Sequence, residues 1–246
     1  MALLLTPRDL LLPTGLEAAL EVEVESRWAP FIDFARAGAE VEVEGHGRGV
    51  SGKDGVARIP LKPLPDGLHR LRVRAGLAEA EAYVRVSPPG APVLITDIDH
   101  TIADVSSVGF IFKASGTVRM VAGARDALAE LAPRMSIVYL SARDHIFVPK
   151  TRGWLQMNGF PEGPLYLRAG TRFWHCRSKR HKLGRLAPLR AAWKDIRAGV
   201  GDVRGDMEAY AAHGIPPILI GPRQLEGLPA GTRWVPGWSE ILKLLA

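Results

Sequence analysis

The stretch Val93-Leu94-Ile95-Thr96-Asp97-Ile98-Asp99-His100-Thr101 decides the fold, because a short apolar run ends there in two aspartates. A run of this length is typical of a buried strand. Asp97 and Asp99 lie two residues apart, so an extended backbone directs both carboxylates to the same side. Their mutual repulsion predicts a neutralising divalent cation, and oxygen ligands beside a phosphate suit Mg²⁺. As ordinary aspartates, the two residues would instead form a turn or cap a helix.

The chemistry that we infer for this pair is phosphoryl transfer to water. One carboxylate attacks phosphorus, while the other protonates the leaving oxygen and then activates water to hydrolyse the acyl phosphate.

From this strand onward, short apolar runs alternate with stretches of helical periodicity. The predicted strands cover residues 93–96, 137–140, 165–167, 198–200 and 218–220, and the predicted helices cover 124–131, 150–158, 183–193, 207–213 and 239–245. This alternation predicts an α/β Rossmann-like domain, in which helices cover both faces of a parallel sheet. Ligands of such sheets bind beyond the carboxyl ends of the strands, where Asp97 and Asp99 fall.

The preceding part of the chain, residues 16–86, follows a period of two, as in Leu20-Glu21-Val22-Glu23-Val24-Glu25. Further strands are predicted at 41–44, 56–61, 69–74 and 82–86, with turn sequences at 52–55 and 65–67. The pattern favours a small antiparallel, immunoglobulin-like sandwich. Segment 87–92 is rich in proline, which extends neither a ladder nor a helix. We therefore predict an all-β domain at residues 1–87, a linker at 88–92 and a catalytic domain at 93–246.

Four polar residues near later predicted elements extend the candidate site. Ser141 ends the second strand and is suited to hold a phosphate oxygen, with a turn or helix N-cap as the alternative. Lys182 precedes a helix and is suited to offset the charge of phosphate and nucleophile, although so basic a segment also supplies lysines by chance. Asp202 follows the fourth strand, where it would complete a metal shell. For Asp206, at the start of the next helix, metal binding and helix capping both stay open.

Several motifs together resemble those of the haloacid dehalogenase-like (HAD-like) phosphatases. They are, in order, DIDHT at 97–101, YLSAR at 139–143, the lysine of KRHKL at 179–183 and GDVRGD at 201–206. YLSAR, TRGWL at 151–155 and GFPEGPL at 159–165 are also similar to the catalytic domain of lipins and of the actin-patch phosphatidate phosphatases. The similarity covers about residues 92–222. A β-sandwich ahead of the catalytic domain agrees with the usual layout of that family.

This resemblance implies a role for each matching residue. Asp97 is then the nucleophile and Asp99 the general acid and base. Phosphate is bound by Thr101, Ser141 and Lys182, and Mg²⁺ is held by Asp97, Asp99 through its backbone carbonyl, Asp202 and Asp206. Candidate substrate-binding residues are Arg143, Arg152 and Arg180.

The chain departs from the family pattern at two places. His100 stands where lipins have glycine and the actin-patch relatives have a third aspartate. A histidine there either titrates near neutral pH beside the site or points away from it. The motif GDVRGD at 201–206 matches the general superfamily pattern better than the lipin one, so it supports the chemistry more than the lipid substrate.

The spacing of the motifs predicts an open site. Between Thr101 and the second strand there is room for only a flap and one helix, and no large cap fits between Ser141 and Lys182. We expect an open site to accept a bulky or membrane-surface phosphate ester. Three alternatives stay open for the basic segment 168–185, which also contains Phe173 and Trp174. It contacts an anionic membrane, it contacts nucleic acid, or it is exposed only to solvent.

Composition bounds the remaining alternatives. The net charge of +6 and pI of about 9.7 favour anionic partners, although genome composition explains them equally well. A single cysteine, Cys176, excludes an internal disulfide, and no signal-like or membrane-spanning apolar stretch is present. We expect a cytoplasmic protein that is peripheral to membranes. The leading hypothesis is a Mg²⁺-dependent phosphatidate phosphatase; the alternatives are a polynucleotide 3′-phosphatase and a non-catalytic binding protein that retains the fold.

Overall fold

The computed structural model describes residues 3–29, 32–168 and 178–246. Contacts divide the chain into two compact units, Met1–Pro88 and Pro89–Ala246. The division falls within the proline-rich segment in which we predict a linker. Each unit is described by itself below.

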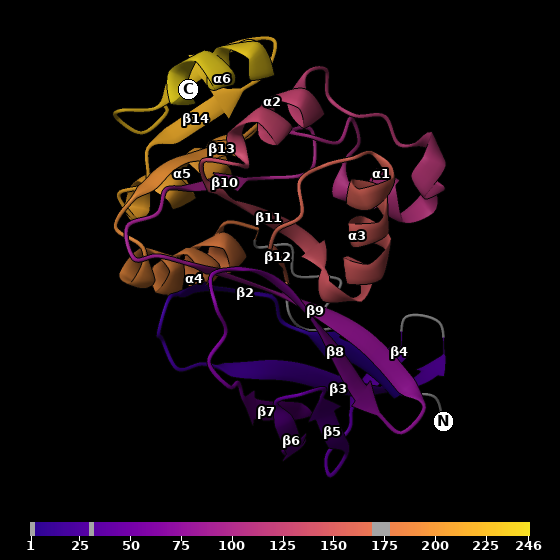
Figure 1. The fold of residues 1–246 in the computed structure, drawn as a ribbon. Coiled ribbons are helices and arrows are strands. Elements are labelled where there is room, and N and C mark those ends of the chain that lie inside the picture. The colour runs from indigo at the N-terminus through magenta and orange to yellow at the C-terminus, as the bar shows by residue number, and fades with distance from the viewer. Residues whose placement is uncertain (1–2, 30–31, 169–177) are drawn as a thin grey trace. The chain divides into compact units, whose positions relative to one another are not determined.

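The first unit is built from strands in its described residues (Figure 1). They are β1 (Leu3–Pro7), β2 (Leu10–Pro13), β3 (Ala19–Ala29), β4 (Ile32–Ala35), β5 (Glu40–Val43), β6 (Gly47–Val50), β7 (Val56–Pro60), β8 (Gly67–Ala75) and β9 (Ala78–Ser87). One sheet has the order β1-β3-β4, with β7 also paired to β3, and the other has the order β2-β9-β8-β5-β6. The alternation along β3 buries Leu20, Val22 and Val24 completely, as the sequence pattern predicts.

The sandwich prediction needs one correction, because not every pairing in this unit is antiparallel. β2 runs parallel to β9, with Leu10 opposite Val84. The sequence patterns also missed β1, β2, β4 and β6, whose short or proline-containing runs show little alternation. The immunoglobulin-like relationship of this unit stays a prediction.

The second unit contains the predicted parallel sheet. Its strands are β10 (Val93–Thr96), β11 (Ser136–Asp144), β12 (Leu165–Arg168), β13 (Ile196–Gly201), β14 (Pro217–Ile220) and β15 (Arg233–Val235). The order is β12-β11-β10-β13-β14-β15, and each neighbouring pair is parallel. This confirms the Rossmann-like sheet and adds β15, a strand of three residues that is too short to show a period.

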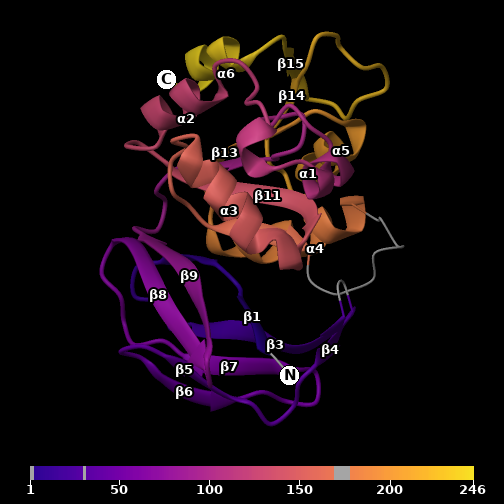
Figure 2. The same ribbon diagram turned by 90° about the vertical axis from the view of Figure 1, so that its right-hand side faces the viewer.

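Six α-helices connect and cover the strands among the described residues. They are α1 (Ser107–Phe112), α2 (Ala124–Leu131), α3 (Val148–Met157), α4 (Ser178–Ala192), α5 (Arg204–Ala212) and α6 (Trp238–Leu245), with short 3-10 turns at Ser115–Thr117 and His145–Phe147. Apolar residues of α2, α3 and α6 join one core cluster with alternate residues of the strands. Helices α4 and α5 pack on each other on the other face (Figures 1 and 2).

The connections near the carboxyl ends of the central strands are short. Between β10 and β11 lie only α1, a 3-10 turn and α2, in a segment that is described throughout. No cap domain is inserted there, in agreement with the spacing of the motifs. Among the described residues, no helix has both the length and the apolar character needed to cross a membrane.

Candidate active site

Asp97 lies at the centre of a buried ion-pair cluster. It directly follows β10, and its backbone N–H donates to the carbonyl of Val200 on β13 (2.9 Å). The Nζ of Lys182 lies 2.9 Å from Asp97 Oδ1 and 2.5 Å from Asp206 Oδ1. These three residues are buried, with 5%, 2% and 1% exposure for Asp97, Lys182 and Asp206. Lys182 therefore bridges two carboxylates, and it lies within helix α4 rather than just before a helix, which corrects our expectation about its position.

Three carboxylates in this cluster lie close enough to share a cation. One oxygen of each of Asp97, Asp202 and Asp206 lies within 4.8 Å of the others. Among the described atoms, Oδ2 of Asp206 is buried and has no hydrogen-bond partner. Such an oxygen is costly to bury alone and is suited to a metal ligand. The residues of this cluster therefore fit a hard cation such as Mg²⁺.

Gly201 explains how Asp206 reaches this cluster. A Cβ on Gly201 would lie 2.3 Å from Asp206 Oδ2, so a larger residue would displace the carboxylate. Asp206 does not cap its helix, since the N-cap residue of α5 is Val203. The capping alternative for Asp206 is therefore wrong, and its carboxylate instead binds Lys182.

Asp99 makes a second, separate set of contacts. Arg143 donates from Nη2 to Oδ1 (2.9 Å) and from Nε to both oxygens (3.1 and 3.2 Å). The hydroxyls of Ser107 and Ser141 donate to Oδ2 at 2.7 and 3.1 Å. Both carboxylate oxygens are thus occupied by donors. Ser141 also lies inside β11 rather than at its end, and it contacts Asp99 instead of capping a helix.

Arg143 is itself held by residues of two helices. Its guanidinium lies 3.6 Å from the centre of the Phe110 ring, and Nη1 donates to Thr151 Oγ1 at 3.3 Å. The Nζ of Lys150 lies 4.9 Å from the same ring on α1. Arg143 is 3% exposed, so it is a buried cation with a fixed position rather than a mobile surface arginine. Its substrate-binding role stays a prediction.

The formal charges of the residues around Asp97 and Asp99 sum to a negative value that a divalent cation would balance. The four carboxylates of Asp97, Asp99, Asp202 and Asp206 face two buried cations, Lys182 and Arg143. Two negative charges stay uncompensated, which is the charge that one Mg²⁺ would neutralise.

The pKa values of the cluster follow from this imbalance. Burial raises the pKa of Asp97 to about 7; Lys182 opposes this rise, and the charges of Asp206 and Asp99 add to it. Burial, together with the charge of Asp97, raises the pKa of Asp202 to about 6. Burial likewise raises the pKa of Asp206. For Lys182, burial opposes the ammonium form, but its two carboxylate partners outweigh burial and raise its pKa.

Two residues of the first motif have special environments. His100 is exposed and adopts a left-handed backbone, with φ of 55°. This conformation favours glycine, which explains why glycine suits this position in related motifs. Thr101 is buried, and its carbonyl accepts a hydrogen bond from Trp238 Nε1 (2.8 Å). Thr101 Oγ1 is buried and has no hydrogen-bond partner among the described atoms, and its phosphate-binding role stays a prediction.

The substrate-binding roles of Arg152 and Arg180 stay predictions. Arg152 is half-buried on α3. Arg180 lies on α4, but its side chain is outside the described residues, as are residues 169–177 of the basic segment. Within that segment, Arg168 pairs with Asp144 (3.0 Å), so one of its cations is already matched by a carboxylate.

Sequence reasoning missed the contributions of α1. Ser107, which contacts Asp99, and Phe110, which stacks on Arg143, lie on a helix of six residues that is too short for a periodicity signal. The N-cap Ser106, which accepts from the N–H of Gly109, was the one available signal for this helix.

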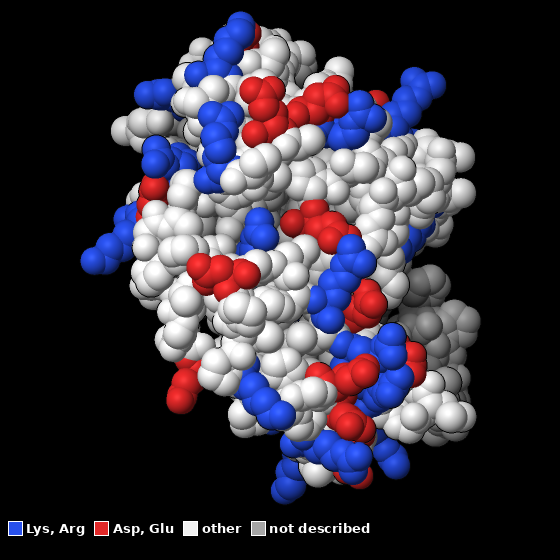
Figure 3. Space-filling view, viewed as in Figure 1, with Lys and Arg blue, Asp and Glu red and all other residues white. Residues whose placement is uncertain are grey.

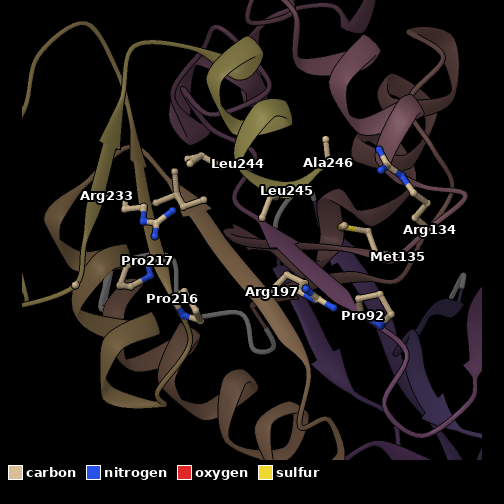
Figure 4. A pocket seen from close by; sticks show the side chains of 12 residues that line it. Pro92, Arg134, Met135, Arg197, Pro216, Pro217, Arg233, Leu244, Leu245 and Ala246 are labelled. Carbon is tan, nitrogen blue, oxygen red and sulfur yellow. The ribbon is translucent and has the colours of Figure 1, made fainter.

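A cavity of about 530 Å³ lies at the opposite edge of the sheet (Figure 4). Its lining includes Arg134, Arg197 and Arg233 around an apolar floor, near the amino ends of the strands. The lining residues include no carboxylate side chain, and Asp97 lies at the other edge.

On the face shown in Figure 3, positive and negative side chains are interspersed. The net positive charge is therefore not concentrated in one stripe of that face.

Comparison with known proteins gives a family match. The family model described as "PITM 1-3, LNS2 domain" matches residues 94–220, which is more than half of the chain. A search of curated proteins by sequence gave no match.

Several solved structures are similar to part of this chain. A D,D-heptose 1,7-bisphosphate phosphatase from B. bronchiseptica, in complex with magnesium and phosphate, is 20% identical; the match covers 63% of this chain and 97% of that one, with a TM-score of 0.47. A HAD-superfamily hydrolase from Geobacter sulfurreducens is 15% identical over 64% and 98% of the chains, with a TM-score of 0.45. A chain of the Pnkp1/Rnl/Hen1 RNA repair complex is 13% identical over 52% and 42%, with a TM-score of 0.44.

Proposed function

Because this chain belongs to the LNS2 domain family, whose lipin-like domain has the HAD-like phosphatase fold, we propose that it is a Mg²⁺-dependent phosphohydrolase acting on phosphatidate or a related lipid phosphate. The observation that carries the proposal is the Asp97 cluster. Two buried carboxylates, one half-buried carboxylate and a bridging lysine lie at the carboxyl edge of the sheet, where ligands of this fold bind.

In the proposed reaction, a carboxylate oxygen of Asp97 attacks phosphorus and the bond to the leaving oxygen breaks. Asp99 gives a proton to that oxygen, so the alcohol product leaves and an aspartyl phosphate stays on Asp97. Water then attacks the phosphorus and loses a proton to Asp99, which releases inorganic phosphate and restores Asp97. Lys182 and Ser141 would hold the non-bridging phosphate oxygens.

The cation belongs to the Asp97 half of the site. Asp97, Asp202 and Asp206 would hold Mg²⁺, with the carbonyl of Asp99 as a further ligand. Bound Mg²⁺ supplies positive charge that offsets the repulsion between the phosphate dianion and the nucleophile.

Asp97→Asn is the direct test of the nucleophile. We expect phosphate release from phosphatidate micelles with Mg²⁺ to fall by roughly 10⁴-fold or more, because an amide cannot form the acyl phosphate. An acid quench with labelled substrate should trap a phosphoenzyme in the native protein and none in the variant. Asp126→Asn, at an exposed position on α2, is the matched control and should keep full activity. Undiminished turnover by Asp97→Asn would remove the nucleophile assignment.

A second candidate is a phosphate-binding protein without turnover. It is favoured by the contacts of Asp99, both of whose oxygens already accept hydrogen bonds from Arg143, Ser107 and Ser141. A carboxylate held in this way must lose one of these hydrogen bonds and take up a proton before it can protonate a leaving group. Saturable phosphatidate binding with no phosphate release, in native protein and Asp97→Asn alike, would establish this alternative.

The substrate is tested by comparing three phosphate esters under the same conditions. We expect phosphatidate to be hydrolysed faster than 3′-phosphorylated oligonucleotides and sugar phosphates, since the short connections leave the site open to a bulky ester. Faster turnover of the oligonucleotides would favour the polynucleotide 3′-phosphatase instead. A cytoplasmic location with peripheral membrane contact stays part of the proposal.

A further inference from the structure

Helix α1 is apolar on two opposite sides. Phe110 is completely buried, whereas Val108 is 64% exposed and Phe112 is 84% exposed. Residues four apart lie on the same face of a helix, so Val108 and Phe112 form one exposed face, opposite Phe110. Single exposed apolar residues are common, but two on one helix face form a patch that indicates a contact surface.

The exposed face belongs to a well-anchored helix. Lys150 Nζ donates to the carbonyls of Phe110, Ile111 and Lys113, at 2.6, 3.0 and 2.8 Å, and so satisfies groups at the end of α1. On the buried side, the Phe110 ring packs edge-to-face on Trp154 with centroids 6.4 Å apart. The apolar side chains therefore point outward from a fixed support.

The patch also lies beside the candidate site. Ser107, on the same helix, donates to Asp99 at 2.7 Å. At the Asp202 side of the site, Val203 is 47% exposed and follows Asp202 directly. Exposed apolar residues thus directly follow Ser107, which contacts Asp99, and Asp202.

Charge favours an anionic partner for this surface. Lys113 and Arg119 are exposed in the segment that carries α1, against one exposed carboxylate, Asp104. An apolar helix face with adjacent cations is the composition that binds at the interface of anionic bilayers. Lys113 follows Phe112 directly, so its ammonium can reach lipid phosphates while Phe112 enters the apolar layer.

We propose that the exposed face of α1, comprising Val108, Phe112 and Lys113, docks on an anionic lipid surface and brings lipid phosphate groups to the site beside it. This inference rests on the proposed lipid-phosphate function, to which it adds the surface that engages the bilayer. The contact lies on α1, outside the basic segment 168–185.

The test is cosedimentation of the full chain with phosphatidylcholine vesicles that contain phosphatidate. Phe112→Ser and the double variant Val108→Ser, Phe112→Ser should weaken binding by about tenfold or more, because the apolar area that leaves water is lost. Met157→Ser on α3, at a position that is 65% exposed, is the matched control and should bind as the native chain does. Phe112→Trp, unlike Phe112→Ser, should bind the vesicles as the native chain does, since tryptophan suits the bilayer interface.

The binding assay needs no turnover, so it separates the docking surface from the chemistry. Asp97→Asn should sediment with vesicles as the native chain does, even when it releases no phosphate. Equal binding by Phe112→Ser and the native chain would overturn the proposal. So would equal losses in Phe112→Ser and Met157→Ser, or a Phe112→Ser effect confined to self-association or to binding a protein.

Discussion

The two halves of the candidate site differ in how their charges are balanced. Around Asp97, three carboxylates lie close together and the ammonium of Lys182 pairs with two of them, while one oxygen of Asp206 has no hydrogen-bond partner among the described atoms. Around Asp99, a single carboxylate accepts hydrogen bonds from a guanidinium and two hydroxyls. The first half lacks positive charge and suits a cation, while the second is complete and holds its carboxylate in one orientation. Asp97 and Asp99 are the same residue type, but their neighbours give the two carboxylates different electrostatic environments.

Arg143→Ala should have the largest effect on stability. It leaves the buried Asp99 carboxylate without its cation, for which we expect a loss of about 3–5 kcal/mol in the free energy of unfolding. Urea denaturation measures this loss, and added Mg²⁺ should not restore it, because the cation binds in the other half of the site. Arg125→Ala, at an exposed position on α2, is the control and should change stability by less than about 0.5 kcal/mol. Full rescue of Arg143→Ala by Mg²⁺ would contradict the separation of the halves.

Lys182→Met removes the only buried ammonium from the Asp97 half, as far as the described residues extend. Without Mg²⁺ we expect destabilisation of about 2–4 kcal/mol, less than for Arg143→Ala because Asp97 and Asp206 can take up protons. Mg²⁺ should recover part of this loss, since it neutralises the same carboxylates. Thermal melts with and without Mg²⁺ measure the recovery, and identical behaviour of the two variants would show that the halves are not distinct.

The stabilisation by Mg²⁺ should increase with pH. Asp97 and Asp202 have pKa values raised from 3.8 to about 7 and about 6 in the folded chain. At a pH between the unfolded value of 3.8 and the folded value, the unfolded chain has released protons that the folded chain retains. The metal-free protein therefore loses stability as the pH rises through this range. Mg²⁺ binds the ionised carboxylates, and its effect on the melting temperature should therefore be small near about pH 5 and larger near about pH 8. A constant effect across this range would place the cation elsewhere.

His100→Gly should have the smallest effect, a gain in stability of at most about 1 kcal/mol. Glycine adopts the positive φ of this position without strain, although it also increases the entropy of the unfolded chain. Turnover should be preserved, because the side chain of His100 is exposed. A large loss of activity, measured beside the melting temperature, would assign His100 a part in the chemistry.

The sequence predicted the parallel sheet well because its signals are local. Each buried strand is a short apolar run and each covering helix has its own period, so β10 and α2 were predicted with their observed bounds. The expectation that Asp97 and Asp202 would meet followed from parallel strands that end at the same edge, whereas for Asp206, at the start of the next helix, capping was an open alternative. The proposed roles of these residues stay predictions.

The contacts of Arg143 and Lys182 were beyond the reach of sequence patterns. A pattern shows that an arginine stands two residues after Ser141, but not that its guanidinium turns to Asp99 and stacks on Phe110, since rotamers depend on packing. Lys182 sits inside a helix whose start was predicted too late, at residue 183 instead of Ser178. In the first unit, β2 was missed because its four residues, Leu10–Pro13, end in proline and show no alternation.

The hydrogen bond from Trp238 to the carbonyl of Thr101 has a consequence for synthesis of the chain on the ribosome. The loop that follows Asp97 and Asp99 is made early, but this support comes from α6, 137 residues later. Such a distant closure is slow relative to local helix formation. The growing chain therefore carries its acidic loop incompletely fixed until α6 emerges, and a nascent chain that stops before Trp238 would lack this support.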